Sequence, residues 1–256
     1  MLSFTRRPGS RPGAPRLALI HSLALDRTVW DGVVAQLDGD VDLLTFDCRG
    51  HGASPKTPGP YSAQMFARDV AELFDEVGWE TAAVAGCSMG GNVAQAFAAE
   101  YPRRVTALGL IDTTAWYGPD GATNFAKRAA TARADGMRSL IDFQLTRWFS
   151  DAFRESHPDV LKRTFDVFVA SDVDCYAASC GLLGEADTRA ALPSFKVPVA
   201  IVVGEEDYAT PVAMARQLHA AIPQSTLTIL PRARHLTPIE CPDRIAAELR
   251  GLLARV

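Results

Sequence analysis

Short apolar runs that alternate with longer amphipathic segments place the strongest constraint on the fold of this 256-residue chain. Short runs bounded by turn residues are typical of buried parallel strands, and apolar residues spaced three or four apart are typical of helices. The predicted strands are 16–20, 41–46, 81–85, 105–111, 197–203 and 225–230. The clearest helices between them are 62–78, 90–100 and 242–254. This alternation predicts an α/β fold with a mostly parallel sheet flanked by helices.

One interval, 119–191, interrupts the alternation with helical patterns and no convincing strand. Its amphipathic or apolar stretches are 136–149, 160–170 and 175–186. Open α/β sheets bind ligands at the carboxyl ends of their strands, so an insertion between two core strands is well placed to cover that edge. We therefore predict a core formed by 1–118 and 192–256 and a helical cap formed by 119–191. Helices that only pad a face of the sheet are the less favoured interpretation.

Composition excludes several classes of protein. Apolar residues make up 48% of the chain and charged residues 22%, which is enough for a buried core and too little charge for disorder. A net charge of −4 argues against binding to nucleic acid or to an anionic membrane. Five scattered cysteines without a C-x-x-C pair, and the absence of an apolar leader or of a run long enough to span a bilayer, favour a cytoplasmic protein.

Residues 86–90 read Gly-Cys-Ser-Met-Gly, a G-x-S-x-G pattern that follows a predicted strand and precedes a predicted helix. This context is typical of a nucleophile elbow, in which a sharp turn exposes a serine above the sheet. Glycines are expected at both ends because larger side chains would collide with the neighbouring strand and helix. Ser88 would then lie at a helix N-terminus, whose partial positive charge favours an oxyanion. Cys87 is expected to pack inward as a small buried hydrophobe.

A neutral serine needs a general base, and the base needs an acid to orient it. His235 lies in the loop after the last predicted strand, and Asp207 directly follows the strand 197–203. The order Ser88, Asp207, His235 is typical of this fold, and we predict these three as the catalytic residues. Less favoured alternatives for the acid are Glu205, Glu206 and Asp112.

Acyl transfer also needs two backbone N–H groups directed at the developing oxyanion. Met89, the residue after the nucleophile, is expected to supply one, and Leu23, in the loop after the first predicted strand, the other. His21 opens that loop and is expected to belong to its structure without acting as the base. His51 is expected to fix a glycine-rich loop. The pattern shows no cluster of metal ligands, and neither a metal nor a cofactor is expected.

Together, HSLALDRTVW, FDCRGHGAS, GCSMGG, GEEDYATP and RHLTPIECPD resemble the α/β-hydrolase superfamily over nearly the whole chain. Within it, the chain is most similar to the 3-oxoadipate enol-lactonases. That resemblance depends on the H-S-L loop followed by Trp30, on RGHGAS-x4-GPYS, and on the stretches TRWFSDAFRESHP and ASDVDCYAASCGLL. The resemblance implies a serine hydrolase that opens a small carboxylate-bearing lactone through an acyl-enzyme.

Two features depart from the enol-lactonase pattern. The loop that reads N-S-L-G in that family reads His21-Ser22-Leu23-Ala24 here. Only 15 residues precede the first predicted strand. This segment is too short, and too rich in proline and glycine, for the usual opening hairpin. The sheet edge is therefore expected to be exposed or covered by a partner subunit, as in a homodimer.

A buried carboxylate needs a cation, and Arg147, beside Trp148 in the predicted cap, is the first candidate for binding it. The alternative, weighed equally, is that Arg147 is solvated while Trp148 packs under the cap. Two other functions remain open. One is a carboxylesterase, or another lactonase or perhydrolase of the same fold, acting on a different ester or lactone. The other, much less favoured, is a ligand receptor without catalytic activity.

Overall fold

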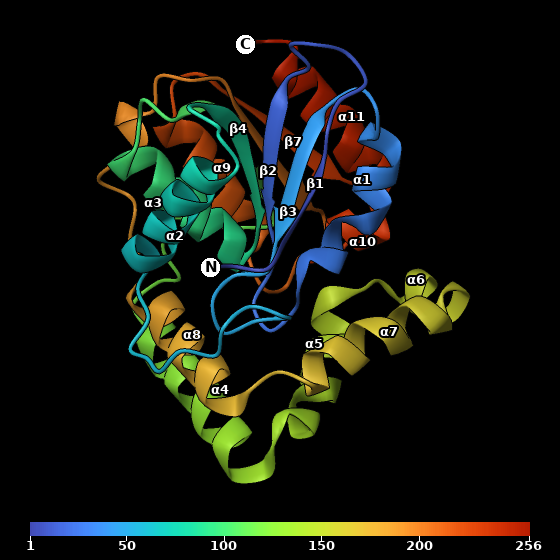
Figure 1. Ribbon diagram of the computed structural model, residues 1–256. Helices are drawn as coiled ribbons and strands as arrows, with labels where there is room; N and C mark the ends of the chain where they lie inside the picture. Colours follow the sequence, from blue (N-terminus) through green and yellow to red (C-terminus); the bar gives the residue numbers. More distant parts are fainter.

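A computed structural model describes the whole chain, residues 1–256. Its centre is a seven-stranded sheet in the order β1-β3-β2-β4-β5-β6-β7, parallel except for β1 (Figure 1). The strands are β1 (Phe4–Arg7), β2 (Arg16–Ile20), β3 (Asp42–Phe46), β4 (Ala82–Cys87), β5 (Val105–Ile111), β6 (Val199–Gly204) and β7 (Ser225–Leu230). All six predicted strands are confirmed, each to within two residues at either end. The predicted α/β class and mostly parallel sheet are also confirmed.

The expectation that the N-terminal residues leave this edge of the sheet uncovered was wrong, because the chain covers β3 with its own N-terminal segment, whereas the homodimer stays a prediction. Strand β1 pairs antiparallel with β3, with Phe4 opposite Phe46 and Arg7 opposite Leu43. The Arg6 guanidinium donates two hydrogen bonds to the Asp42 carboxylate, at 2.8 and 3.0 Å. The run Phe4-Thr5-Arg6-Arg7 is short and polar, so its strand conformation depends on this long-range pairing and not on a local pattern.

Helices cover both faces of the sheet (Figure 1). On one face lie α2 (Ala63–Glu76), α3 (Met89–Glu100) and α9 (Val212–Ala221); on the other lie α1 (Asp31–Leu37), α10 (Thr237–Glu240) and α11 (Pro242–Leu253). Helix α2 begins where the Ser62 hydroxyl accepts a hydrogen bond from Met65 N–H, and it buries Phe66, Val70 and Phe74. Burying each such side chain is worth about 1.5–3 kcal/mol, which fixes the amphipathic helix on the sheet.

Only helices occur between β5 and β6 in the interval that was predicted to be helical. They are α4 (Gly121–Asp135), α5 (Ile141–Trp148), α6 (Asp151–Ser156), α7 (Pro158–Val169) and α8 (Val173–Glu185). Figure 1 places them, in green, yellow and light orange, beyond one end of the sheet. Helices α4 and α8 pack against each other. An isolated antiparallel bridge between Trp116 and Asp187 joins the segments that enter and leave this helical insertion.

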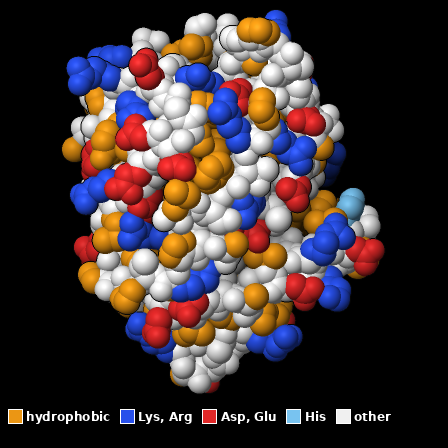
Figure 2. Space-filling view, viewed as in Figure 1, with side chains coloured by type: hydrophobic (Ala, Val, Ile, Leu, Met, Phe, Trp, Pro, Cys, Tyr) orange, Lys and Arg blue, Asp and Glu red, His pale blue; other side chains and the backbone are white.

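The helices include no single segment that could span a membrane, and the face drawn in Figure 2 carries charges of both signs. No single helix is long and apolar enough to cross a bilayer; α7 and α8 meet that measure only as a pair, and they are bent by 95° at the break between them. Figure 2 shows acidic and basic side chains interspersed over the face that it presents.

Candidate active site

Ser88 occupies a strained turn between β4 and α3. Its backbone has φ 56° and ψ −116°, in the region that L side chains rarely adopt. A Cβ at Gly86 would lie 2.0 Å from the Gly90 carbonyl oxygen, and a Cβ at Gly90 would lie 2.2 Å from the Ile20 oxygen. Both clashes involve backbone atoms, which confirms the steric reason for glycine at these positions. Cys87 is fully buried, as predicted.

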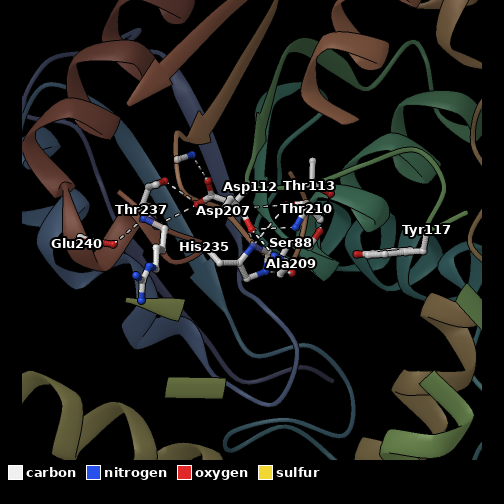
Figure 3. A network of polar contacts seen from close by, with 12 residues as sticks. Ser88, Asp112, Thr113, Tyr117, Asp207, Ala209, Thr210, His235, Thr237 and Glu240 are labelled. Carbon is white, nitrogen blue, oxygen red and sulfur yellow. Dashed lines mark hydrogen bonds and ion pairs between the residues drawn. The ribbon is translucent and has the colours of Figure 1, made fainter. Parts of the chain in front are cut away.

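The turn brings Ser88 to His235, and His235 to Asp207 (Figure 3). The His235 Nδ1 lies 2.8 Å from Asp207 Oδ2, so the ring N–H at Nδ1 donates to the carboxylate. This leaves Nε2 to accept the Ser88 hydroxyl hydrogen bond, at 2.9 Å. All three side chains are buried. The geometry is that of a nucleophile, a base that can take its proton, and an acid that orients the base.

The Asp207 carboxylate is held in place by further donors from its own loop. Its Oδ1 accepts the N–H groups of Ala209 (2.7 Å) and Thr210 (2.8 Å), and its Oδ2 accepts the Thr210 hydroxyl (2.8 Å). Burial alone would raise the pKa of Asp207, but the charge and hydrogen bond of His235 and the bonds from Thr210 outweigh it and hold the pKa below its usual value. The acid is therefore kept ionised.

Asp112, the alternative acid, lies close to this network but does not bond to His235. Its carboxylate accepts from Thr237 N–H (3.0 Å), the Thr237 hydroxyl (2.6 Å) and Gly204 N–H (3.2 Å). Burial and the charge of Asp207 raise its pKa well above the ordinary value. Because Thr237 follows His235 closely and Gly204 precedes Asp207, Asp112 ties together the two loops that carry the base and the acid (Figure 3).

The two backbone N–H groups that are predicted to bind the oxyanion belong to Met89 and Leu23. Met89 begins α3 directly after Ser88, and Leu23 lines the same cavity as Ser88 and His235. Neither N–H donates a hydrogen bond within the protein. Both are therefore free to bind an oxygen that carries negative charge.

Ser88 and His235 line a cavity of about 140 Å³ between the sheet edge and the helical insertion. A water needs roughly 10–15 Å³ of such space, so the cavity has room for about ten waters or a similarly small ligand. Its wall contains Ser22, Leu23, Tyr117, Phe125, Arg128, Gln144, Arg147, Trp148, Leu183 and Met214, among others. A small, partly polar organic molecule fits this lining better than a long acyl chain.

Two arginines from the helical insertion, Arg147 on α5 and Arg128 on α4, line this cavity. Neither forms a salt bridge, and Arg128 Nε has no hydrogen-bond partner. Their guanidinium groups lie 4.8 Å (Arg147) and 5.4 Å (Arg128) from the centre of the Phe143 ring. Burial, followed by the charge of Arg128, lowers the pKa of Arg147. Two cations without acidic partners form a site suited to an anionic group.

The structure places both Arg147 and Trp148 in the cavity wall, and the binding of a carboxylate by Arg147 stays a prediction. Arg147 is half-buried in the cavity wall, whereas Trp148 both lines the cavity and packs within the insertion, stacked on Phe165 of α7 with ring centres 5.4 Å apart. Sequence reasoning missed Arg128, because α4 is rich in alanine and its apolar face is weakly marked. It also missed Gln144, a buried side chain in the wall whose Nε2 has no partner.

No group of three histidine, cysteine or carboxylate side chains is arranged to hold a metal ion. All five cysteines are free. The polar groups that surround the cavity include Ser88, His235 and the two arginines Arg128 and Arg147, which together are called the cationic wall.

Comparison with known proteins agrees with this architecture. The chain is 30% identical to 3-oxoadipate enol-lactonase 2 of Acinetobacter baylyi, over 94% of this chain and 89% of the relative. The crystal structure of the enol-lactonase from Burkholderia xenovorans LB400 matches with a TM-score of 0.94 and 34% identity, covering 99% and 96% of the two chains. A malate-bound thermophilic esterase from Thermogutta terrifontis matches with a TM-score of 0.92 and 29% identity, covering 99% and 93%. Residues 15–242 match the α/β hydrolase fold family, and the chain belongs to that family.

Proposed function

We propose that this protein is a serine hydrolase that opens a small carboxylate-bearing lactone of the 3-oxoadipate enol-lactone type through an acyl-enzyme. The observation that carries the proposal is that Ser88 and His235, the latter bonded to Asp207, line one small cavity together with two arginines that lack acidic partners. The similarity to enol-lactonases from two organisms supports the same substrate class.

In the proposed reaction, His235 Nε2 takes the Ser88 proton as Oγ attacks the ring carbonyl carbon. Negative charge develops on the carbonyl oxygen, where the N–H groups of Leu23 and Met89 are free to bind it. The ring C–O bond breaks, and the enol oxygen receives the proton from His235 while staying on the same acyl chain. The enol then becomes a ketone, and His235 activates a water that releases the acid and restores Ser88.

The cationic wall would bind the substrate carboxylate at the end remote from the ring carbonyl. Arg147 and Arg128 stand on neighbouring helices of the insertion, both over the Phe143 ring. A guanidinium can hold a carboxylate by two parallel hydrogen bonds, which would orient the lactone as well as attract it. No metal and no organic cofactor is needed for any step of this reaction.

The alternative is a carboxylesterase, or another lactonase or perhydrolase, that uses the same triad on a different substrate. It is favoured by the similarity to the Thermogutta terrifontis esterase and to a pimeloyl-[acyl-carrier protein] methyl ester esterase of Chromobacterium violaceum. The latter is 30% identical over 86% of this chain and 87% of the relative. The lactonase needs Arg147 and Arg128 to bind the substrate carboxylate, whereas an esterase that acts on a neutral substrate does not.

The test compares 3-oxoadipate enol-lactone with neutral p-nitrophenyl acetate in Arg147→Met and Arg128→Met variants. A charge-assisted hydrogen bond is worth about 1.5–3 kcal/mol, so each variant is expected to lose roughly 10- to 150-fold in kcat/KM for the lactone and little for the neutral ester. Arg133→Met is the matched control, because Arg133 lies exposed on α4 and pairs with Asp174 outside the cavity. Equal losses on both substrates, or ester cleavage without lactone turnover in the unmodified protein, would favour the esterase.

A further inference from the structure

We propose that His21 is a positioning residue that locks the Ser22–Leu23 peptide group with the Leu23 N–H facing Ser88, so that this half of the oxyanion site is formed before substrate binds. The inference extends the proposed function, because it concerns the same nucleophile. It does not depend on the identity of the substrate, since every ester or lactone develops charge on the same oxygen.

The first support is the direction of the peptide group. The Ser22 carbonyl oxygen lies 2.7 Å from His21 Nδ1, and it also accepts a longer bond from Leu25 N–H at 3.4 Å. In a trans peptide the carbonyl and the following N–H point in opposite directions. The Leu23 N–H must therefore point away from the His21 ring. It has no acceptor in the protein, and Leu23 forms part of the cavity wall with Ser88.

The second support is that the bonding pattern fixes the tautomer of His21. Cys48 N–H, two residues after the end of β3, donates to His21 Nε2 at 2.9 Å, so Nε2 carries no proton. The remaining ring proton is on Nδ1, where it can donate to the Ser22 carbonyl. The ring is completely buried, and its edge-to-face contact with His51, with centres 5.1 Å apart, restricts its rotation. The ring thus links the segment that follows β3 to the loop after β2.

The third support is strain in the loop. Ala24 has φ 57°, a left-handed conformation that is unfavourable for a residue with a Cβ. Such a conformation persists only where surrounding contacts determine it. If the Ser22–Leu23 peptide turned over, its carbonyl would lose both donors and its oxygen would face the cavity, where it would repel an oxyanion. The His21 bond opposes that turn.

The test uses His21→Leu, which removes both bonds, and His21→Asn, whose side-chain amide can restore a donor near the Nδ1 position. Removing one oxyanion donor typically costs about 100- to 1000-fold in kcat. His21→Leu, which only releases the peptide, is expected to lose roughly 10- to 100-fold in kcat on p-nitrophenyl acetate with little change in KM, and His21→Asn to recover part of it. Affinity for methylboronic acid, which forms a tetrahedral adduct with a reactive serine, should fall by the same factor as kcat.

His219→Leu is the control for the loss of a histidine, because His219 lies exposed on α9, bonds to Ser225 and does not line the cavity. It is expected to keep kcat and boronate affinity. A His21→Leu variant that folds with unchanged kcat and boronate affinity would overturn the proposal. In the unmodified protein, histidine 15N shifts should show the Nδ1–H tautomer for His21, and the Nε2–H tautomer would equally overturn it.

These readouts separate the two proposals. Failure of Ser88→Ala to abolish hydrolysis would contradict the proposed function. The tautomer of His21 would still test whether His21 fixes the orientation of the Ser22–Leu23 peptide group.

Discussion

Replacing Gly90 by alanine should separate the steric demand of the elbow from the ordinary preference of helices for alanine. A Cβ at Gly90 would lie 2.2 Å from the Ile20 oxygen and 2.7 Å from the His21 oxygen. A normal contact between carbon and oxygen needs roughly 1 Å more, and both neighbours are backbone atoms of β2 and its loop. Helix α3 and strand β2 must therefore move apart for the side chain to fit.

The size of the effect follows from two opposing contributions. Overpacking of this kind costs about 1–3 kcal/mol, and sometimes more when backbone must move. Alanine in place of glycine within a helix recovers up to about 1 kcal/mol. We expect Gly90→Ala to lower the free energy of unfolding by about 1–2 kcal/mol, and to lower kcat because the displaced loop carries Leu23.

Gly181→Ala is the matched control. Gly181 lies exposed within α8, and a Cβ there would meet nothing within 4 Å, so the helix preference acts alone. This variant should gain about 0.5–1 kcal/mol and keep its kcat. Urea unfolding and p-nitrophenyl acetate hydrolysis measure both quantities. If the two variants change stability in the same direction, or if Gly90→Ala retains full activity, the steric account of the elbow is refuted.

Two further predictions concern the acid of the triad and the helical insertion. The pKa of Asp207 is lower in the folded protein than in the unfolded chain, so its ionisation stabilises the fold above about pH 4, and this stabilisation is lost as pH falls further. The free energy of unfolding of Asp207→Asn should therefore fall less steeply between about pH 5 and pH 2 than that of the unmodified protein; equal slopes would contradict the assignment. Trp148→Ala removes a buried ring packed on Phe165 and Phe168 and should cost about 3–5 kcal/mol in urea unfolding, whereas a cost under about 1 kcal/mol would show that the insertion does not depend on it.

The elements that were predictable from the sequence are those whose signal is local. Each central strand is a continuous apolar run because both faces are covered, and α2 shows its buried stripe in its own periodicity. The elbow was predictable because its sequence signal, a serine between two glycines, lies within one strand–turn–helix unit, although Gly90 itself is constrained by Ile20 of β2. His235 and Asp207 could be proposed because the carboxyl ends of parallel strands meet at one edge of the sheet.

The features that were missed depend on contacts between distant segments. Strand β1 exists through pairing with β3, about 40 residues further along the chain, and its four residues carry no apolar alternation. Arg128 enters the cavity because α4 packs on α8, which decides the face that an alanine-rich helix turns inward. The role of Asp112 in joining two loops required the positions of Thr237 and Gly204 in space.

The most direct test of the central claim is the turnover of 3-oxoadipate enol-lactone by the purified protein beside its Ser88→Ala variant. The unmodified protein should open the lactone, and the variant should lose at least about 10⁴-fold in kcat, because the nucleophile acts as a unit with His235 and Asp207. Turnover by Ser88→Ala at a rate near that of the unmodified protein would contradict the assignment of the nucleophile. Absence of lactone turnover in the unmodified protein would contradict the proposed substrate.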